Sequence, residues 1–165
     1  MAKSLFILLS LVAVASASDD KTDRATLKGI NAVCVVVEGT DQAHSKLSKE
    51  QLQTDIEGKL KQAGISIDKG GTTCLYLNIR ALQALGRQAI GRKEKPIPLY
   101  AVDVRLEFLQ TVALTRDQAT KTYAPTWSTA NMATVASDDL GKTALEITIS
   151  LVDQFVTAYK SVNPR

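Results

Sequence analysis

The 165-residue sequence has little of the residue types that mark special classes of protein. Its 2 cysteines, 4 prolines and 9 glycines exclude a disulfide-dense miniprotein, a collagen-like repeat and a low-complexity disordered chain. A large excess of charge of one sign is also missing, because 20 basic residues face 17 acidic ones. A net charge of +3 creates no strong overall field toward nucleic acid, so any charged contact must come from a local patch.

Charged residues are absent between Lys3 and Asp19. The apolar run Leu5–Val14 is followed by Ala15-Ser16-Ala17, the small-x-small pattern that signal peptidase accepts. This apolar run is too short to span a membrane, which takes about 20 residues, and no later apolar run is long enough. No cysteine follows Leu5–Val14 as a lipid acceptor. We therefore predict a cleaved secretory signal peptide at residues 1–17, a flexible lead-in at 18–26 and a single domain at 27–165.

The clearest helix signal lies between Ser48 and Gly64. Ser48 can cap the first turn, Gln51 completes the pattern of a capping box, and Gly64 provides the stop. Apolar residues recur between them at helical spacing, which predicts a helix over Lys49–Ala63 with one buried face. These apolar residues are Leu52, Ile56, Leu60 and Ala63.

Runs of β-branched and alternating residues predict the strands. Between Tyr100 and Phe108 apolar and polar side chains alternate, as in an antiparallel sheet with one solvent-exposed face. The pattern continues to Leu114, and because one unbroken strand would be very long, we expect a bulge or bend beyond Gln110. Pro125 places the start of the last strand at a sheet edge. The predicted strands cover 32–37, 74–80, 100–108 and 122–135, with a short extended piece at 65–67.

A second helix is predicted from the N-cap Ser137 to about Tyr159. The order of all these elements predicts an α+β fold, a two-layer sandwich in which a mainly antiparallel sheet carries two helices packed on one face. If the first two strands are parallel, the crossover between them must be right-handed.

The second predicted helix has an apolar arc wider than one sheet contact needs. One stripe, expected to face the sheet, consists of Leu140, Ala144, Ile147, Leu151, Phe155 and Ala158. A second stripe, turned by roughly 100–180° at about 100° per residue, consists of Leu145, Ile149, Val152, Val156 and Tyr159. Either the first helix and a connecting loop cover this second stripe, or it is an interface for a partner, a lipid or a second copy of the chain.

Cys34 and Cys74 do not form a Cys-x-x-Cys pair, which disfavours thioredoxin-like redox catalysis. Both fall in predicted strands. In an oxidising compartment they either form one structural disulfide, closing a loop of about 40 residues, or remain two buried free thiols.

The stretch Gly86–Pro98 combines glycine, proline and basic residues, and it is predicted to be a basic loop. Such a loop can hold an anion, a lipid head group or a nucleic-acid backbone. A solvated basic loop without a binding role is commoner, and Glu94 and the lack of aromatic residues favour that alternative. The candidate ligand-binding residues are Arg87, Arg92, Lys93 and Lys95.

No set of residues points to catalysis, a cofactor or a metal. His44 is the single histidine and has no metal-ligand spacing around it. The glycines lack the spacing of phosphate and dinucleotide loops. Asp103 and Glu107 share a strand face with Arg105 between them, which indicates a charge-balanced solvated face rather than an acid–base pair.

Several segments resemble a set of uncharacterised secreted bacterial proteins: Leu27–Ile30 before the valine-rich strand ending in Glu38, Gln51–Ile65, Leu75–Leu77, the pair Thr126-Trp127, and the ending Val152–Pro164 with the pattern Val-Asp-x-Phe-Val-x-x-Tyr-x-x-Val-Asn-Pro. The resemblance implies a bacterial periplasmic location and supplies no substrate or active site. The order of elements is also similar to that of small envelope accessory proteins, including the lipopolysaccharide-assembly lipoproteins, although the lipid-acceptor cysteine is absent.

These features favour a non-catalytic periplasmic interaction or envelope accessory protein. Its partner would be an envelope protein or a second copy of the chain, with no nucleic acid involved. A carrier of a small apolar or anionic ligand is the second hypothesis, and an enzyme is the third.

Overall fold

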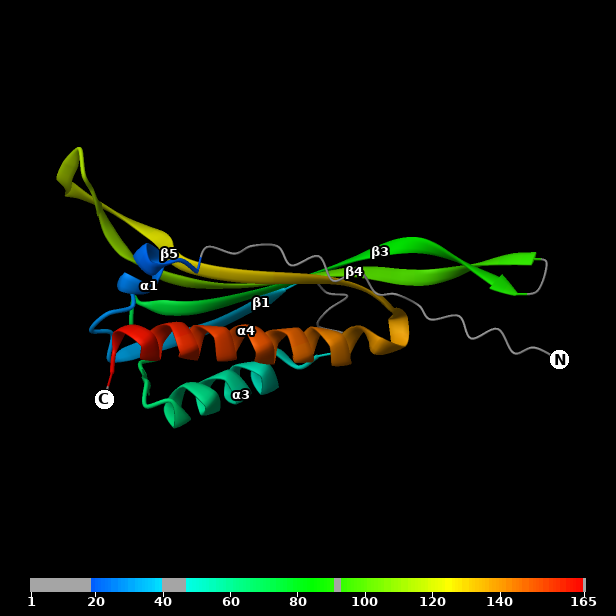
Figure 1. Cartoon of the computed structure of the whole chain (residues 1–165), viewed down its shortest axis with the longest axis horizontal. Helices are drawn as coiled ribbons and strands as arrows, with labels where there is room; N and C mark the ends of the chain where they lie inside the picture. Colours follow the sequence, from blue (N-terminus) through cyan, green and yellow to red (C-terminus); the bar gives the residue numbers. More distant parts are fainter. Residues whose placement is uncertain (1–18, 40–46, 91–92, 165) are drawn as a thin grey trace.

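The structure, a computed structural model, describes residues 19–39, 47–90 and 93–164 (Figure 1). The predicted α+β sandwich is confirmed, with a five-stranded sheet in the order β2-β1-β3-β4-β5 and helices α3 and α4 on one face. β1 is parallel to β2 and β3, and the other pairs are antiparallel. The elements are α1 (Lys21–Ala25), β1 (Ala32–Gly39), α3 (Lys49–Gln62), β2 (Ser66–Ile67), β3 (Cys74–Ile90), β4 (Lys93–Leu114), β5 (Asp117–Ala136), the 3-10 turn η1 (Ser137–Asp139) and α4 (Leu140–Val162).

Local signals set the ends of α3 as predicted. The Ser48 hydroxyl accepts a hydrogen bond from the Gln51 backbone N–H at 3.2 Å, and Gly64 ends the helix with a φ of +81°, which suits glycine. The capping box is only half formed, because the Gln51 amide donates to Asp55 instead of to the Ser48 backbone. At α4 the predicted cap differs: Ser137 begins the 3-10 turn, and the α-helix starts at Leu140.

The core lies between the sheet and the two helices. Inward-facing side chains of β1, β3 and β4 meet the first predicted stripe of α4, all six residues of which are buried. At the centre, the Phe155 ring lies 5.3 Å from Trp127 and 5.7 Å from Phe108, measured between ring centroids. Edge-to-face and tilted ring pairs of this kind add to area burial, so α4 is fixed on the sheet by aromatic contacts.

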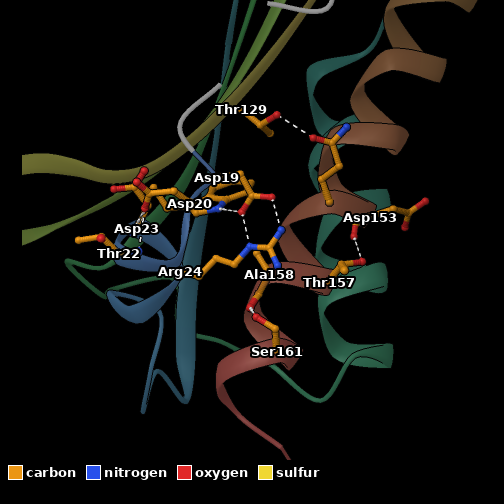
Figure 2. Close-up of polar contacts among 12 residues, drawn as sticks. Asp19, Asp20, Thr22, Asp23, Arg24, Thr129, Asp153, Thr157, Ala158 and Ser161 are labelled. Carbon is orange, nitrogen blue, oxygen red and sulfur yellow. Dashed lines mark hydrogen bonds and ion pairs between the residues drawn. The ribbon is translucent and has the colours of Figure 1, made fainter. Parts of the chain in front are cut away.

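The residues before β1 are folded rather than a flexible lead-in. Asp20 caps α1 through the Thr22 and Asp23 backbone N–H groups. The Asp19 carboxylate accepts two hydrogen bonds from Arg24 (Figure 2) and a third from the indole N–H of buried Trp127 at 2.9 Å. The polar composition suggested a lead-in, but the contact with β5 comes from a residue more than 100 positions away and leaves no local sequence signal.

The predicted basic loop Gly86–Pro98 is wrong, because β3 and β4 continue through it as a hairpin. Pairing extends to Ile90 opposite Lys93, and β3 and β4 span 17 and 22 residues. Two hairpins therefore project past the helices, β3–β4 at one end of the molecule and β4–β5 at the other (Figure 1). The irregularity expected beyond Gln110 is present as a register shift at Ala113/Leu114, and a second, unpredicted shift lies before Gln110 at Phe108/Leu109. The predicted edge position of Pro125 is also confirmed, since β5 is the last strand of the sheet.

Candidate functional site

An apolar groove lies between α3 and α4. The helices run in the same direction beneath the sheet (Figure 1), and an ion pair between Lys59 and Asp153 joins them in their C-terminal halves. A space of about 370 Å³ remains between most of α3 and the N-terminal half of α4. Its apolar lining consists of Leu52 and Ile56 from α3 and Leu145, Ile149 and Val152 from α4.

The second predicted stripe of α4 is divided by this groove. Val152 and Tyr159 are buried, and the Tyr159 hydroxyl donates to the Ile30 carbonyl at 2.9 Å. Leu145 and Val156 are half-buried, and 38% of Ile149 is exposed. Within the described residues, α3 and the segment before β1 thus cover one end of the stripe, while Leu145 and Ile149 face the open groove.

Gly58 is an unusual residue to find on the wall of this groove. It lies in the interior of α3, where glycine costs about 1 kcal/mol relative to alanine. A Cβ atom added at this position would meet no heavy atom within 4 Å. Packing within the described chain therefore gives no reason for a glycine here, and its effect is to widen the groove. The sequence contained this signal, a glycine inside a strong helical pattern, but only the structure shows where it points.

Several polar groups at the groove have partners within the chain. The Thr148 hydroxyl donates to the Ala144 carbonyl at 2.8 Å, and Asp55 accepts from the Gln51 amide at 2.8 Å. Lys59 is held by Asp153. The lining is mainly aliphatic, with Leu52, Ile56, Leu145, Ile149 and Val152 in it, and this favours an apolar occupant.

The outer face of the sheet carries a polar network. The Tyr76 hydroxyl donates to Glu38 at 2.6 Å, the Asn78 amide donates to Tyr76 at 3.2 Å, and Arg80 donates to the Asn78 carbonyl oxygen at 3.1 Å. The hydrogen bond to Glu38 raises the pKa of Tyr76. On β4, Arg105 lies 3.8 Å from Glu107. These contacts make the outer face a charge-balanced surface, as the alternation of β4 predicts.

Other shifted pKa values also have structural causes. The hydrogen bond from Arg24 lowers the pKa of Asp19, and that from Thr120 lowers the pKa of Asp117 at the start of β5. In the described part of the chain, no three His, Cys, Asp or Glu side chains are placed to hold a metal ion. His44 lies outside the described residues.

The alternative left open for the cysteines is decided by the structure, which bonds Cys34 to Cys74. The two residues are register partners on the adjacent parallel strands β1 and β3, with their Cα atoms 4.4 Å apart. That separation lies at the near end of the range that a disulfide spans. Both are buried, on the outer face of the sheet.

The predicted basic residues are placed on the projecting β3–β4 hairpin. Arg87 is exposed on β3, and Lys93 and Lys95 belong to β4 opposite Ile90 and Gln88. Arg92 lies outside the described residues. The hairpin extends past the helices at one end of the molecule (Figure 1), and none of the described residues that line the groove belongs to it.

No family model and no curated protein matches the chain. Among solved structures it is similar to a neuraminyllactose-binding hemagglutinin homologue from Helicobacter pylori, with 13% identity, a TM-score of 0.42, and coverage of 82% of this chain and 90% of that one. It is similar to a PelC dodecamer from Paraburkholderia phytofirmans, with 16% identity, a TM-score of 0.41, and coverage of 88% and 96%. The rare lipoprotein B from Shewanella oneidensis has 15% identity, a TM-score of 0.37, and coverage of 79% and 96%.

Similarities of this extent carry no conclusion about function, which must come from the contacts of this chain. Among the described helices, none has the length and apolar character required to cross a membrane.

Proposed function

We propose that this chain is an exported, non-catalytic binding protein that receives aliphatic side chains of a partner protein in the groove between α3 and α4. The observation that carries the proposal is Gly58, which keeps the groove wide at a cost to helix stability that no internal contact explains. Leu145 and Ile149 supply apolar surface on the opposite wall. A partner helix laid along two parallel helices would bury these side chains in the helix-in-groove mode of recognition.

The proposed location is the bacterial periplasm. The disulfide between Cys34 and Cys74 supports an oxidising compartment, and the signal-peptide pattern of residues 1–17 supports export. The resemblance of the C-terminal segment to secreted bacterial proteins points the same way.

A carrier of a small aliphatic ligand is the second candidate function. The groove volume of about 370 Å³ falls within the range of small-molecule sites, roughly 300–1,000 Å³. The partner protein is preferred because the groove reaches the surface at Ile149, which is 38% exposed, whereas ligand pockets enclose most of their ligand.

The first experiment places a photo-crosslinking residue at Ile149, and separately at neighbouring Ser150, in cells that produce the protein. Ser150 is exposed on α4 and does not line the groove. A partner that crosslinks at 149 and not at 150 is then identified, purified and titrated against the wild-type protein. Equal crosslinking at the two positions would contradict the proposal.

The groove is then blocked with Gly58→Leu, and Ser150→Leu serves as the matched control because it adds the same side chain outside the groove. We expect Gly58→Leu to fold normally, since leucine has a higher helix propensity than glycine. Its affinity for the partner should fall by about 10-fold or more, equivalent to about 1.4 kcal/mol. If Gly58→Leu bound the partner with unchanged affinity, the proposal would be contradicted. An aliphatic ligand seen in native mass spectrometry of the wild type and lost from Gly58→Leu would instead establish the carrier.

A further inference from the structure

The β3–β4 hairpin beyond the core has one apolar face. We call residues 82–90 of β3 and 93–101 of β4 the arm. Ala81 and Val102 are buried against the core, so the residues next to them face away from the helices. Continuing at every second position, the described outward residues pair as Leu82 with Ala101, Ala84 with Leu99, and Gly86 with Ile97.

Solvent reaches much of this apolar face. Leu82 is 68% exposed, the most of any large apolar side chain in the described part of the chain. Ala84 is exposed, and Ile97 and Leu99 are half-buried. The opposite face carries exposed Gln83, Arg87 and Pro98 and half-buried Tyr100, and the arm projects past the helices (Figure 1).

Gly86 helps to shape the face. A Cβ atom at this position would lie 2.4 Å from Leu99 Cδ1 and 2.8 Å from Leu99 Cγ. The Leu99 side chain therefore lies across the strand pair over Gly86, next to Ile97. A larger residue at 86 would push Leu99 away, so the glycine lets two aliphatic side chains form one continuous apolar surface.

Positive charge is concentrated on the same arm. Its residues 82–90 and 93–101 contain three basic side chains and one acidic, whereas the rest of residues 18–165 contain 16 basic and 16 acidic. The arm therefore has a formal charge of +2, and the rest of residues 18–165 has a formal charge of zero. The net charge of residues 18–165 thus comes from the arm.

We propose that the arm binds the surface of an anionic lipid bilayer, with its apolar face in the interfacial region and Lys93 and Lys95 on the head groups. Apolar contact combined with a polybasic segment is the two-part signal for peripheral membrane binding. Two copies of the chain stacking through this face would bring two arms of formal charge +2 together, which disfavours self-association.

Backbone pairing limits the depth of this contact. β3 pairs with β1 only as far as Ile79, and β4 pairs with β5 only from Leu99. Further out, each strand of the arm has a single neighbour, so its outer edge needs water or head groups as hydrogen-bond partners. Such an edge is not tolerated in the hydrocarbon core, and the arm therefore lies on the membrane rather than crossing it.

The test is a flotation assay of the protein from residue 18 to residue 165. The vesicles consist either of phosphatidylcholine alone or of phosphatidylcholine mixed with phosphatidylglycerol. We expect binding to the anionic vesicles only, weakening as salt is added. Lys93→Gln and Lys95→Gln together should weaken binding by about fivefold per charge removed. Leu82→Ser should weaken it as well without affecting the fold, because that side chain is 68% exposed.

Two controls carry matched changes outside the arm. Met132→Ser removes a 47% exposed apolar side chain from β5, and Lys142→Gln removes a charge on α4 whose side chain is 76% exposed. Both should bind vesicles like the wild type, and so should Gly58→Leu, which separates this inference from the groove. The proposal would be overturned if the protein did not bind anionic vesicles at low salt, or if the controls lost as much vesicle binding as the arm variants. It would also be overturned if sedimentation showed a dimer that Leu82→Ser abolishes.

Discussion

Removing the disulfide between Cys34 and Cys74 should lower stability by an amount that the chain topology determines. The two residues are separated by 40 positions and bonded directly across the β1–β3 pair. The chain-entropy model for a closed loop of that length gives about 4 kcal/mol at 25 °C, because the bond restricts the unfolded chain. Most of this stabilisation should disappear when the bond is reduced, even though no atom of the core is removed.

The assay is urea unfolding at 25 °C, followed by tryptophan fluorescence of buried Trp127. Oxidised wild type, wild type with reductant, and the variant Cys34→Ala with Cys74→Ala are compared. With a slope of about 2 kcal/mol per molar urea, a loss of about 4 kcal/mol moves the unfolding midpoint down by about 2 M. The reduced wild type and the double variant should have similar midpoints.

Val36→Ala provides the matched control, since Val36 is half-buried two residues after Cys34 on the same face of β1. Its loss should be about 1 kcal/mol and present both with and without reductant. Coincident midpoints for oxidised and reduced wild type would refute the loop-entropy reasoning. The contact between β1 and β3 would then be stabilised by their strand pairing alone, without a contribution from the disulfide.

Two further predictions concern the aromatic core and the contact of Asp19 with it. Phe155→Ala should cost about 3–5 kcal/mol in chemical unfolding, because the ring is fully buried between Trp127 and Phe108; a loss below about 1 kcal/mol would contradict this packing. Asp19→Asn should cost about 1 kcal/mol or less at pH 7, as the ion pair with Arg24 is part-exposed and screened. Because the folded pKa of Asp19 is below its ordinary value of 3.8, this contribution is present above that pH and is lost as the pH falls through the folded pKa. A difference between wild type and Asp19→Asn that stays constant down to pH 2 would show that the carboxylate charge has no part in it.

The sequence by itself determined the elements whose signals are local. Ser48 and Gly64 mark the ends of α3 through hydrogen bonds within a few residues, so the helix could be predicted closely. The alternation from Tyr100 to Phe108 identified β4 and its two faces, and the spacing of apolar residues identified the side of α4 that meets the sheet.

The tertiary structure decided the features that depend on which segments become neighbours. The hairpin at 86–98 was not predicted, because Gly86, Pro96 and Pro98 usually indicate a loop. Proline is tolerated here since this part of β4 has a neighbouring strand on one side only. Cysteine pairing likewise required the parallel register of β1 and β3.

The candidate binding surfaces also come from packing rather than from local pattern. The second stripe of α4 reads as one continuous surface in the sequence, but α3 meets only part of it and leaves Leu145 and Ile149 beside Gly58. Leu82 and Leu99 are far apart along the chain and share a face only through the β3–β4 register. Periodicity reveals which side chains of an element lie together, whereas the partner that covers them is set by contacts between distant segments, and these leave no mark in a single sequence.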